Sequence, residues 1–179
     1  MEGHQLDDAV GLALKNIKAR KEFRRPAATT DRLYKSDFLH PQDLSEDCSG
    51  ACGDNDLISR QERDEEDADP AIHYGLIASG NTLMKDAHIR DTLAKERGVL
   101  CFETEAAGLM NHFPCLVVRG ICDYSDTHKN KEWQGFAAMM AAAYAKDLLC
   151  QISPSKVENA RKLEEGIRSS QFRTLALLA

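Results

Sequence analysis

Acidic side chains stand at two places where an apolar, strand-like stretch has just ended. Glu103 and Glu105 follow residues 99–102, and Asp123 follows residues 115–122. A carboxylate at the end of a strand can accept hydrogen bonds from two neighbouring hydroxyls, which is what a ribose 2′,3′-diol presents. Glu105 would also lie at the start of the next helix, where negative charge is stabilised by about 0.3–1 kcal/mol. Position alone leaves two interpretations of Glu105 open, a ribose ligand and a helix-start residue.

Asp123 stands directly after an apolar stretch, so its side chain would be partly removed from water. An aspartic acid that shares its proton can donate it to N7 of a purine as the base leaves a sugar. An aspartate in this position can also cap the next segment or form an Asx-turn with Ser125, which is its commoner use. The sequence leaves both roles open.

Other familiar catalytic arrangements do not occur in the sequence. His73 and His112 could serve in acid–base chemistry, but no serine or cysteine occupies a recognisable nucleophile elbow, so a hydrolase triad is unsupported. The sequence contains no G-x-G-x-x-G fingerprint, no P-loop and no H-E-x-x-H motif.

Cys48 and Cys52 form a C-x3-C pair, and His40 stands upstream as a possible third metal ligand. Tetrahedral zinc needs four ligands, and no second pair follows at a suitable spacing. We therefore favour plain thiols and expect no metal. Four more cysteines lie in apolar segments and are expected to be reduced core thiols; they are Cys101, Cys115, Cys122 and Cys150.

Strands and helices are expected to alternate in the second part of the chain. The expected strands are 72–78, 99–102 and 115–122, and the expected helices are 85–97, 105–113 and 131–151. Such alternation is typical of an α/β domain with a parallel or mixed sheet covered on both faces. Ligands of these sheets bind beyond the carboxyl ends of the strands. The segments at those ends are Ser79-Gly80-Asn81, Glu103-Thr104-Glu105 and Asp123–Asp126.

The remaining parts of the chain are less regular. Apolar residues at helical spacing predict a helix over 6–24, which Pro26 ends. Turn residues and a run of like charges predict a long loop farther on. We expect four parts: 1–40, an N-terminal helix and extended segment; 41–70, an acidic, cysteine-containing loop; 71–152, the α/β part; and 153–179, a linker with a helix near 155–168 and an apolar tail.

Composition fits one globular domain of 179 residues, with 42% hydrophobic and 29% charged residues. The net charge of -6 argues against a nucleic-acid partner, because binding a phosphate backbone needs a basic surface. The sequence shows neither a signal peptide nor an apolar run of membrane-spanning length. We expect a cytoplasmic protein with no membrane partner.

Three segments resemble, in the same order along the chain, segments of the purine nucleoside phosphorylase/uridine phosphorylase superfamily, which includes nucleosidases. They are IASGNTLMKD (77–86), FETEAAGLMNHF (102–113) and VVRGICDYSD (117–126), and the resemblance covers about residues 72–151. It is strongest to the form found at the front of fungal multidomain proteins, ahead of NACHT-type or repeat modules. Residues 20–40 also resemble that subgroup.

The resemblance implies a three-layer α/β/α sandwich, assembled as dimers or higher oligomers, that acts on purine nucleosides. It implies that Glu103-Thr104-Glu105 lies at the ribose, with Glu105 binding its hydroxyls, and that Asp123 is the general acid at the base. Ser79-Gly80-Asn81 would form the turn of the base pocket, flanked by Leu83 and Met84. The family needs no cofactor, and its phosphorylases use phosphate as co-substrate.

Two departures from the family pattern affect these expectations. Thr104 replaces the usual methionine under the ribose, which removes apolar contact of about 1–3 kcal/mol by analogy with truncated buried side chains. The N-terminal half of the family domain, with its phosphate-binding turn and arginines, has no counterpart in residues 1–70. We therefore expect a partial sandwich with modest stability or dependence on a partner.

Two functions follow from these expectations. The first is cleavage of the N-glycosidic bond of a purine nucleoside. The alternative is a non-catalytic nucleoside-sensing or assembly module of a NACHT/repeat-type signalling protein.

Overall fold

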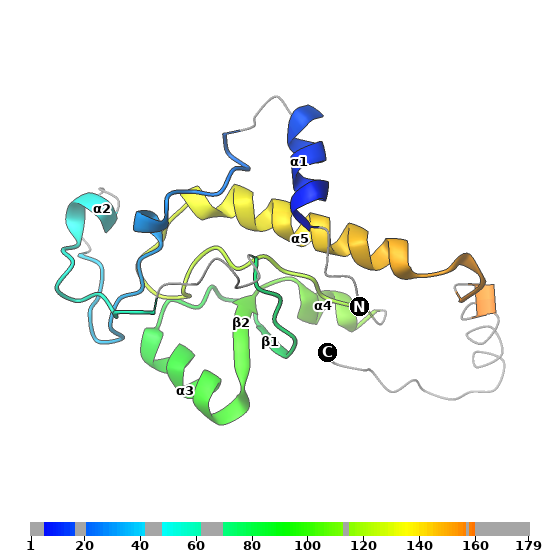
Figure 1. Cartoon of the computed structure of the whole chain (residues 1–179). Coiled ribbons are helices and arrows are strands. Elements are labelled where there is room, and N and C mark those ends of the chain that lie inside the picture. The colour runs from blue at the N-terminus through cyan, green and yellow to red at the C-terminus, as the bar shows by residue number, and fades with distance from the viewer. Residues whose placement is uncertain are drawn as a thin grey trace.

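A computed structural model of the chain describes residues 6–16, 21–41, 48–61, 70–112, 115–156 and 158–159. Most of the acidic run near residue 65 and most of the predicted C-terminal segment, including its apolar tail, lie outside the described residues. Figure 1 shows the arrangement of the elements.

A parallel two-stranded sheet connected through a helix forms the centre of the α/β part. Strands β1 (Leu76–Ser79) and β2 (Val99–Glu103) pair in parallel, with Ser79 opposite Glu103. Helix α3 (Ala87–Arg97) connects them and packs on β2. Parallel strands need such a crossover, because a tight turn cannot return the chain to the same end of the sheet.

Both ends of α3 are set by local chemistry. The Asp86 carboxylate accepts hydrogen bonds from the backbone N–H groups of His88 and Ile89, which have no partner inside the helix. Gly98 ends the helix in the left-handed conformation, with φ of 69°. The predicted helix 85–97 and its glycine stop are confirmed.

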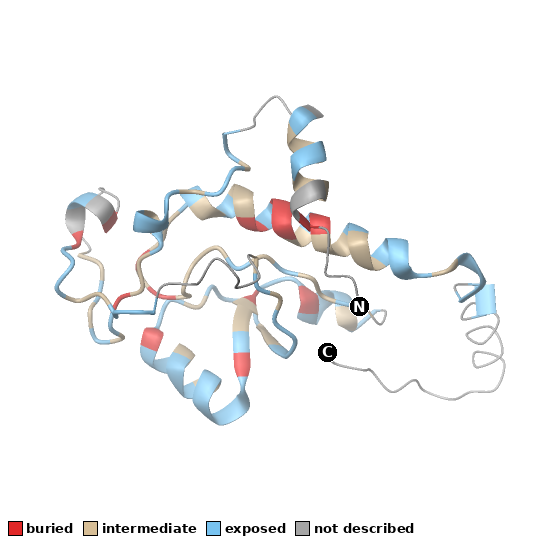
Figure 2. Cartoon of the chain, in the orientation of Figure 1, coloured by how far each residue is buried: buried red, intermediate tan, exposed pale blue. Residues whose placement is uncertain are grey.

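The long helix α5 (Glu132–Gln151) carries the main apolar core. Leu6 of helix α1 (Leu6–Asn16) packs against Met140 and Ala143, with Phe136 partly buried beside them. Figure 2 shows the buried residues of α5 along the stretch that faces α1. The predicted helix 131–151 is confirmed. The predicted helix 6–24 does not reach residue 24. Helix α1 covers Leu6–Asn16, and residues 21–24 form a turn.

The structure corrects the expected third strand. Residues 115–122 have no strand partner, so the sheet among the described residues has two strands rather than three. The chain is broadly α/β, while the three-layer sandwich stays a prediction. β1 begins at Leu76 rather than residue 72, and helix α4 (Ala106–Met110) is shorter than the predicted 105–113. Apolar runs predict burial, but a strand also needs a neighbour with free backbone groups.

Segment 115–122 packs directly on α5 through a glycine. A methyl group at Gly120 would lie 1.9 Å from the carbonyl oxygen of Ala137. Gly135, in the first half of α5, lies equally close to residue 22, since a methyl group there would come within 1.9 Å of the Glu22 carbonyl oxygen. Backbone approaches this close leave no room for a side chain at either position unless the backbone shifts.

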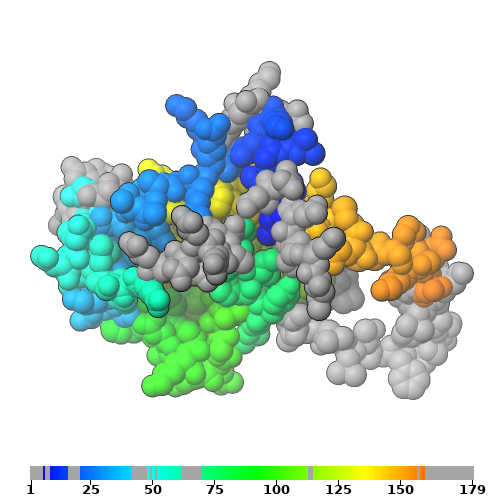
Figure 3. Space-filling model, in the orientation of Figure 1, coloured from blue at the N-terminus to red at the C-terminus, as the bar shows by residue number. Residues whose placement is uncertain are grey.

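The cysteine lobe, which we define as residues 31–41 and 48–61, lies at one end of the molecule. Its two parts lie side by side in Figure 3 and are joined by an isolated antiparallel bridge between Tyr34 and Leu57. Helix α2 (Cys48–Ala51) is a single turn. Tyr34, Cys48 and Cys52 form the small core of the lobe, with Phe38 and Leu57 packed against them.

One indole connects the N-terminal segment to the start of α5. The ring N–H of Trp133 donates to the Thr30 hydroxyl at 3.0 Å, and Thr30 belongs to the 3-10 helix η1 (Ala28–Thr30). The Asn130 side chain donates to the Thr30 carbonyl, also at 3.0 Å. Trp133 packs edge-on against Phe136, with ring centroids 5.9 Å apart. These contacts fix η1 against α5.

Within the described ranges, no helix combines the length and the apolar character that crossing a membrane requires.

Candidate functional site

Ser79 and Glu103 meet at the carboxyl end of the sheet, where both strands end. The Glu103 carboxylate is buried, and its Oε2 accepts from the backbone N–H groups of Glu105 (2.9 Å) and Ala106 (2.8 Å). The Ser79 hydroxyl accepts from the N–H of Ala107 at 2.9 Å. The two side chains thus satisfy the exposed donors at the start of α4. The other oxygen of Glu103, Oε1, is buried and has no hydrogen-bond partner among the described residues.

Glu105 projects outward from the same strand end and is held by its neighbours. The Thr104 hydroxyl donates to its Oε1 at 2.7 Å, and the Arg119 guanidinium contacts its Oε2 at 2.8 Å. The hydrogen bond from the Thr104 hydroxyl, with smaller contributions from the Thr104 N–H and Arg119, lowers the pKa of Glu105. Glu105 is therefore a carboxylate at neutral pH, with acceptor capacity already shared between two partners.

Asp123 is engaged through both carboxylate oxygens. Its Oδ1 accepts from the Ser125 N–H at 2.8 Å, and its Oδ2 contacts the Lys129 ammonium at 2.9 Å. The first contact is an Asx-turn, and Ser125 takes the left-handed conformation with φ of 53°. The structure therefore contains the turn that the sequence left open, while the general-acid role stays a prediction.

A cavity of about 230 Å³ lies beside Asp123, between α3, β2 and residues 121–125. Arg90 lines it and donates to the Tyr124 carbonyl at 2.7 Å. This volume is below the range of about 300–1,000 Å³ typical of small-molecule pockets. Glu105 does not line this cavity, so the structure does not bring the predicted ribose ligand and the predicted general acid to one cavity.

The predicted base-pocket residues lie on an open part of the surface. Gly80, Asn81 and Leu83 are exposed, Leu83 by 60%, while Ser79 and Met84 are partly buried. None of the five lines the cavity beside Asp123. Their assignment to a purine pocket stays a prediction.

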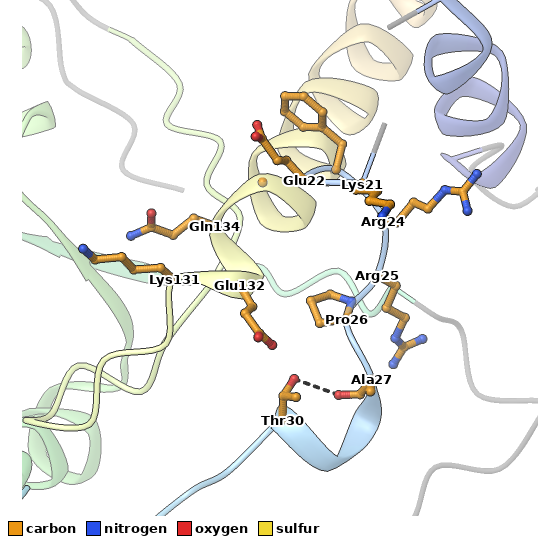
Figure 4. A pocket seen from close by; sticks show the side chains of 12 residues that line it. Lys21, Glu22, Arg24, Arg25, Pro26, Ala27, Thr30, Lys131, Glu132 and Gln134 are labelled. Atoms are coloured by element: carbon orange, nitrogen blue, oxygen red, sulfur yellow. Dashed lines mark hydrogen bonds between the residues drawn. The ribbon is translucent and has the colours of Figure 1, made fainter. Parts of the chain in front are cut away.

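A larger cavity of about 720 Å³ lies between residues 21–30 and the start of α5. Figure 4 shows Lys21, Lys131 and Glu132 among its lining residues, together with the hydrogen bond from the Thr30 hydroxyl to the Ala27 carbonyl. None of the predicted site residues lines it. Size alone therefore does not make it the functional site, and we give more weight to the strand ends, where carboxylates, hydroxyls and arginines converge.

The sequence points to the segment Asp123–Asp126, which contains Tyr124, but does not predict the partners of that tyrosine. The Tyr124 hydroxyl donates to Asp31 at 2.6 Å, and Arg60 pairs with Asp31 at 3.1 Å while also contacting that hydroxyl. Burial, together with the bond to Asp31, raises the pKa of Tyr124 to about 12. This network fixes the segment after Asp123 to the cysteine lobe. The predicted position of Asp123 at a strand end was the one signal pointing to it.

The cysteine lobe brings together a second set of chemically active side chains. One ring nitrogen of His40 and the sulfurs of Cys48 and Cys52 all lie within 4.8 Å of one another. Cys48 and Cys52 are buried, and His40 is partly buried.

Comparison with known proteins gives one informative similarity. No protein-family profile matches the chain, and no solved structure matches it. The chain is 48% identical over 142 residues to a protein of Hyaloscypha variabilis named nucleotide-binding leucine-rich repeat (NLR)-like protein. The match covers 79% of this chain and 13% of that protein. The chain is thus similar to a segment of a much longer fungal NLR-like protein, and the nucleoside phosphorylase resemblance stays a prediction.

Proposed function

We propose that this chain is a module of an NLR-like protein that binds a purine nucleoside without cleaving its N-glycosidic bond. The observation that carries the proposal is the similarity to a protein named for nucleotide binding and leucine-rich repeats, of which this chain corresponds to a small part. A module in such a protein can act by changing its contacts when a ligand binds, and turnover is not needed.

The paired state of the two carboxylates supports binding rather than catalysis. Glu105 is a stabilised anion that accepts hydrogen bonds from Thr104 and Arg119 and can share its lone pairs with ribose hydroxyls. Asp123 contacts the Lys129 ammonium through one oxygen and the Ser125 N–H through the other, so both oxygens hold the local structure. A general acid must carry a proton within reach of the leaving base.

Bond cleavage is the second candidate, favoured by the burial of Glu103 beside Glu105. The unpartnered Oε1 of Glu103 offers an acceptor in a water-poor position at the same strand end as Glu105. In such surroundings a hydrogen bond to substrate is stronger than in water. Ligand-induced separation of Asp123 from Lys129 would be needed for catalysis.

Titration calorimetry with adenosine, inosine and methylthioadenosine tests the proposal. We expect saturable binding to the full chain, and Glu105→Gln should weaken it by about 10–100-fold through loss of a charged acceptor. Glu96→Gln, a change at an exposed residue of α3, is the matched control and should leave binding unchanged. Chromatography of the same mixtures, with and without phosphate, should show no free base.

Two other results would contradict binding without cleavage. Free base released by the wild type but not by Asp123→Asn would establish the cleavage reaction, provided that Asp56→Asn, at another lysine-paired aspartate, stays active. If a chain that circular dichroism shows to be folded does not bind a nucleoside, the binding function is wrong. The remaining proposal is then a module that only mediates assembly.

A further inference from the structure

The C-x3-C pair of the cysteine lobe lies on one turn of helix, which places its two thiols on the same side. The N–H of Cys52 donates to the Cys48 carbonyl at 3.1 Å, as expected for residues four apart. Side chains at this spacing are neighbours on a helix surface. The lobe adds His40, so the two sulfurs and one ring nitrogen form a group with no separation above 4.8 Å.

These separations are close to those of a zinc site. Zn–S bonds of about 2.3 Å and Zn–N bonds of about 2.0 Å hold tetrahedral ligand atoms roughly 3.5–3.8 Å apart. A cluster within 4.8 Å therefore needs to contract by about 1.3 Å at most to bind the ion. Cysteine thiolate and neutral imidazole are the ligands that Zn²⁺ prefers over the oxygen ligands of Ca²⁺ and Mg²⁺.

One hydrogen bond of the His40 ring favours a tautomer that suits metal binding at Nε2. Its Nδ1 lies 2.9 Å from the Pro41 carbonyl, which can only accept, so Nδ1 carries the proton and Nε2 keeps a lone pair. The His40 backbone N–H donates to the Thr127 hydroxyl at 2.9 Å and fixes the residue to the segment after Asp123. A backbone carbonyl behind a ligand histidine is a common outer partner in zinc sites.

A second histidine supplies an independent observation. His128 is 6% exposed, and neither ring nitrogen has a hydrogen-bond partner among the described residues. Its ring stacks on Tyr34 of the lobe core with centroids 4.0 Å apart, and its centroid lies 5.8 Å from that of His40. A buried imidazole whose nitrogens make no hydrogen bond is costly unless something else satisfies it.

Asp126 stands behind the His128 ring. Its carboxylate is buried and lies 3.7 Å from the Nδ1 of His128. This is the order of groups found in carboxylate–histidine–zinc arrangements, in which the acid orients the ring and the second nitrogen binds the ion. His128 lies outside the three-residue group, so its ring has to move toward the cluster when an ion binds.

We propose that His40, Cys48 and Cys52 bind a Zn²⁺ ion and that His128 completes the tetrahedron. The site would be structural, because all four positions are protein ligands and none is left for substrate. The ion would add a crosslink to a lobe whose described parts are joined by one isolated bridge, the ion pairs Arg32–Asp54 and Lys35–Asp56, and a small apolar core. Small units with little apolar core are commonly stabilised by a metal or by disulfides.

Metal analysis of the full chain, purified under reducing conditions with added zinc, tests the site. We expect one Zn²⁺ per chain by elemental mass spectrometry, and the visible bands of tetrahedral, thiolate-bound cobalt when Co²⁺ replaces it. Cys48→Ser and Cys52→Ser should each lose the bound metal. Cys150→Ser, which changes an exposed cysteine on α5, should keep it.

The histidines are tested separately. His40→Gln and His128→Gln should each weaken cobalt binding and shift its bands, while His88→Gln, on the exposed face of α3, should change neither. Unchanged bands in His128→Gln would overturn the assignment of the fourth ligand.

Two results would overturn the site as a whole: a wild-type chain that stays metal-free in excess Zn²⁺, or zinc retained in both cysteine variants. A Cys48–Cys52 disulfide in the freshly purified chain, seen as a mass two hydrogens lower without reductant, would also contradict it. Because a variant could fail to fold, a chelator is added to the wild type as well. Chelation should lower its melting temperature, and added zinc should restore it.

Discussion

The carboxylates at the strand ends are each controlled by a neighbour only one to a few residues away along the chain. Thr104 shows this most directly. Its hydroxyl donates to Glu105, and this bond is the main cause of the lowered pKa of that carboxyl group. The family resemblance predicts Thr104 only as a lost methionine, but its hydroxyl is a hydrogen-bond donor that lowers the pKa of Glu105.

Replacing Thr104 with valine should raise the pKa of Glu105 toward its ordinary value, because valine has the same shape and no donor. A lowered folded-state pKa stabilises the protein above the unfolded pKa, and this stabilisation is lost as pH falls through the folded value. Thr104→Val should thus be less stable than wild type at neutral pH and equal to it in acid.

Carbon-detected NMR titration of the glutamate side chains measures this pKa. Thr104→Ser keeps the hydroxyl and should leave the Glu105 titration unchanged. An unaltered curve in the valine variant would show that the hydroxyl has no part in the shift, and that the backbone N–H of residue 104 and Arg119 set the pKa of Glu105.

Some contacts of these carboxylates could be predicted from the sequence, and others could not. An aspartate two residues before Ser125 predicts an Asx-turn from local geometry, and the structure contains it. Lys129 and Arg119 could not be predicted as partners, because their distances to Asp123 and Glu105 depend on how loops fold back in space. Local capping is encoded in spacing, and ion pairing across loops is not.

Among the elements, helices with defined ends were predicted best. Asp86 and Gly98 mark the two ends of α3 by chemistry that a sequence displays, and the structure has that helix at 87–97. Segment 115–122 was predicted as a strand on apolar character, but it packs on α5 through Gly120 and pairs with no strand among the residues that the structure describes. Burial against a helix and burial within a sheet leave the same apolar pattern in a sequence.

The glycine contacts of α5 give a prediction at this scale. Gly120→Ala and Gly135→Ala should each destabilise the fold by about 1–3 kcal/mol, as overpacking usually does. The added methyl groups would meet the carbonyl oxygens of Ala137 and Glu22. At Gly135 this outweighs the gain of about 1 kcal/mol that alanine gives within a helix.

Thermal unfolding followed by circular dichroism compares these variants with Gly108→Ala. A methyl group at Gly108, within α4, meets nothing within 4 Å, so this control should be neutral or stabilising. Equal melting temperatures for all three variants would contradict the close packing of α5.

At the scale of the whole molecule, the small sheet is incompletely covered. Among the described residues each strand has one neighbour, so each has one open edge. Tyr74, Leu76 and Leu100 expose 73%, 39% and 45% of their surface around it. Open edges flanked by apolar side chains favour pairing with another chain or another part of a longer protein.

We therefore expect the isolated chain to self-associate as its concentration rises. Sedimentation velocity over a range of concentrations should show a growing weight-average mass, and Leu100→Lys should reduce it. Leu149→Lys, at a site 69% exposed near the end of α5, should have little effect. A monomer at every concentration would mean that the open edges of the sheet do not mediate self-association.

The contact between Trp133 and Thr30 has a practical consequence. Trp133 is the single tryptophan of the chain, so its fluorescence comes from one known place. Its indole donates to the Thr30 hydroxyl, and the wavelength of its emission maximum therefore reports whether η1 is packed against the start of α5. Intrinsic fluorescence can therefore follow the contact between η1 and α5 without an attached dye.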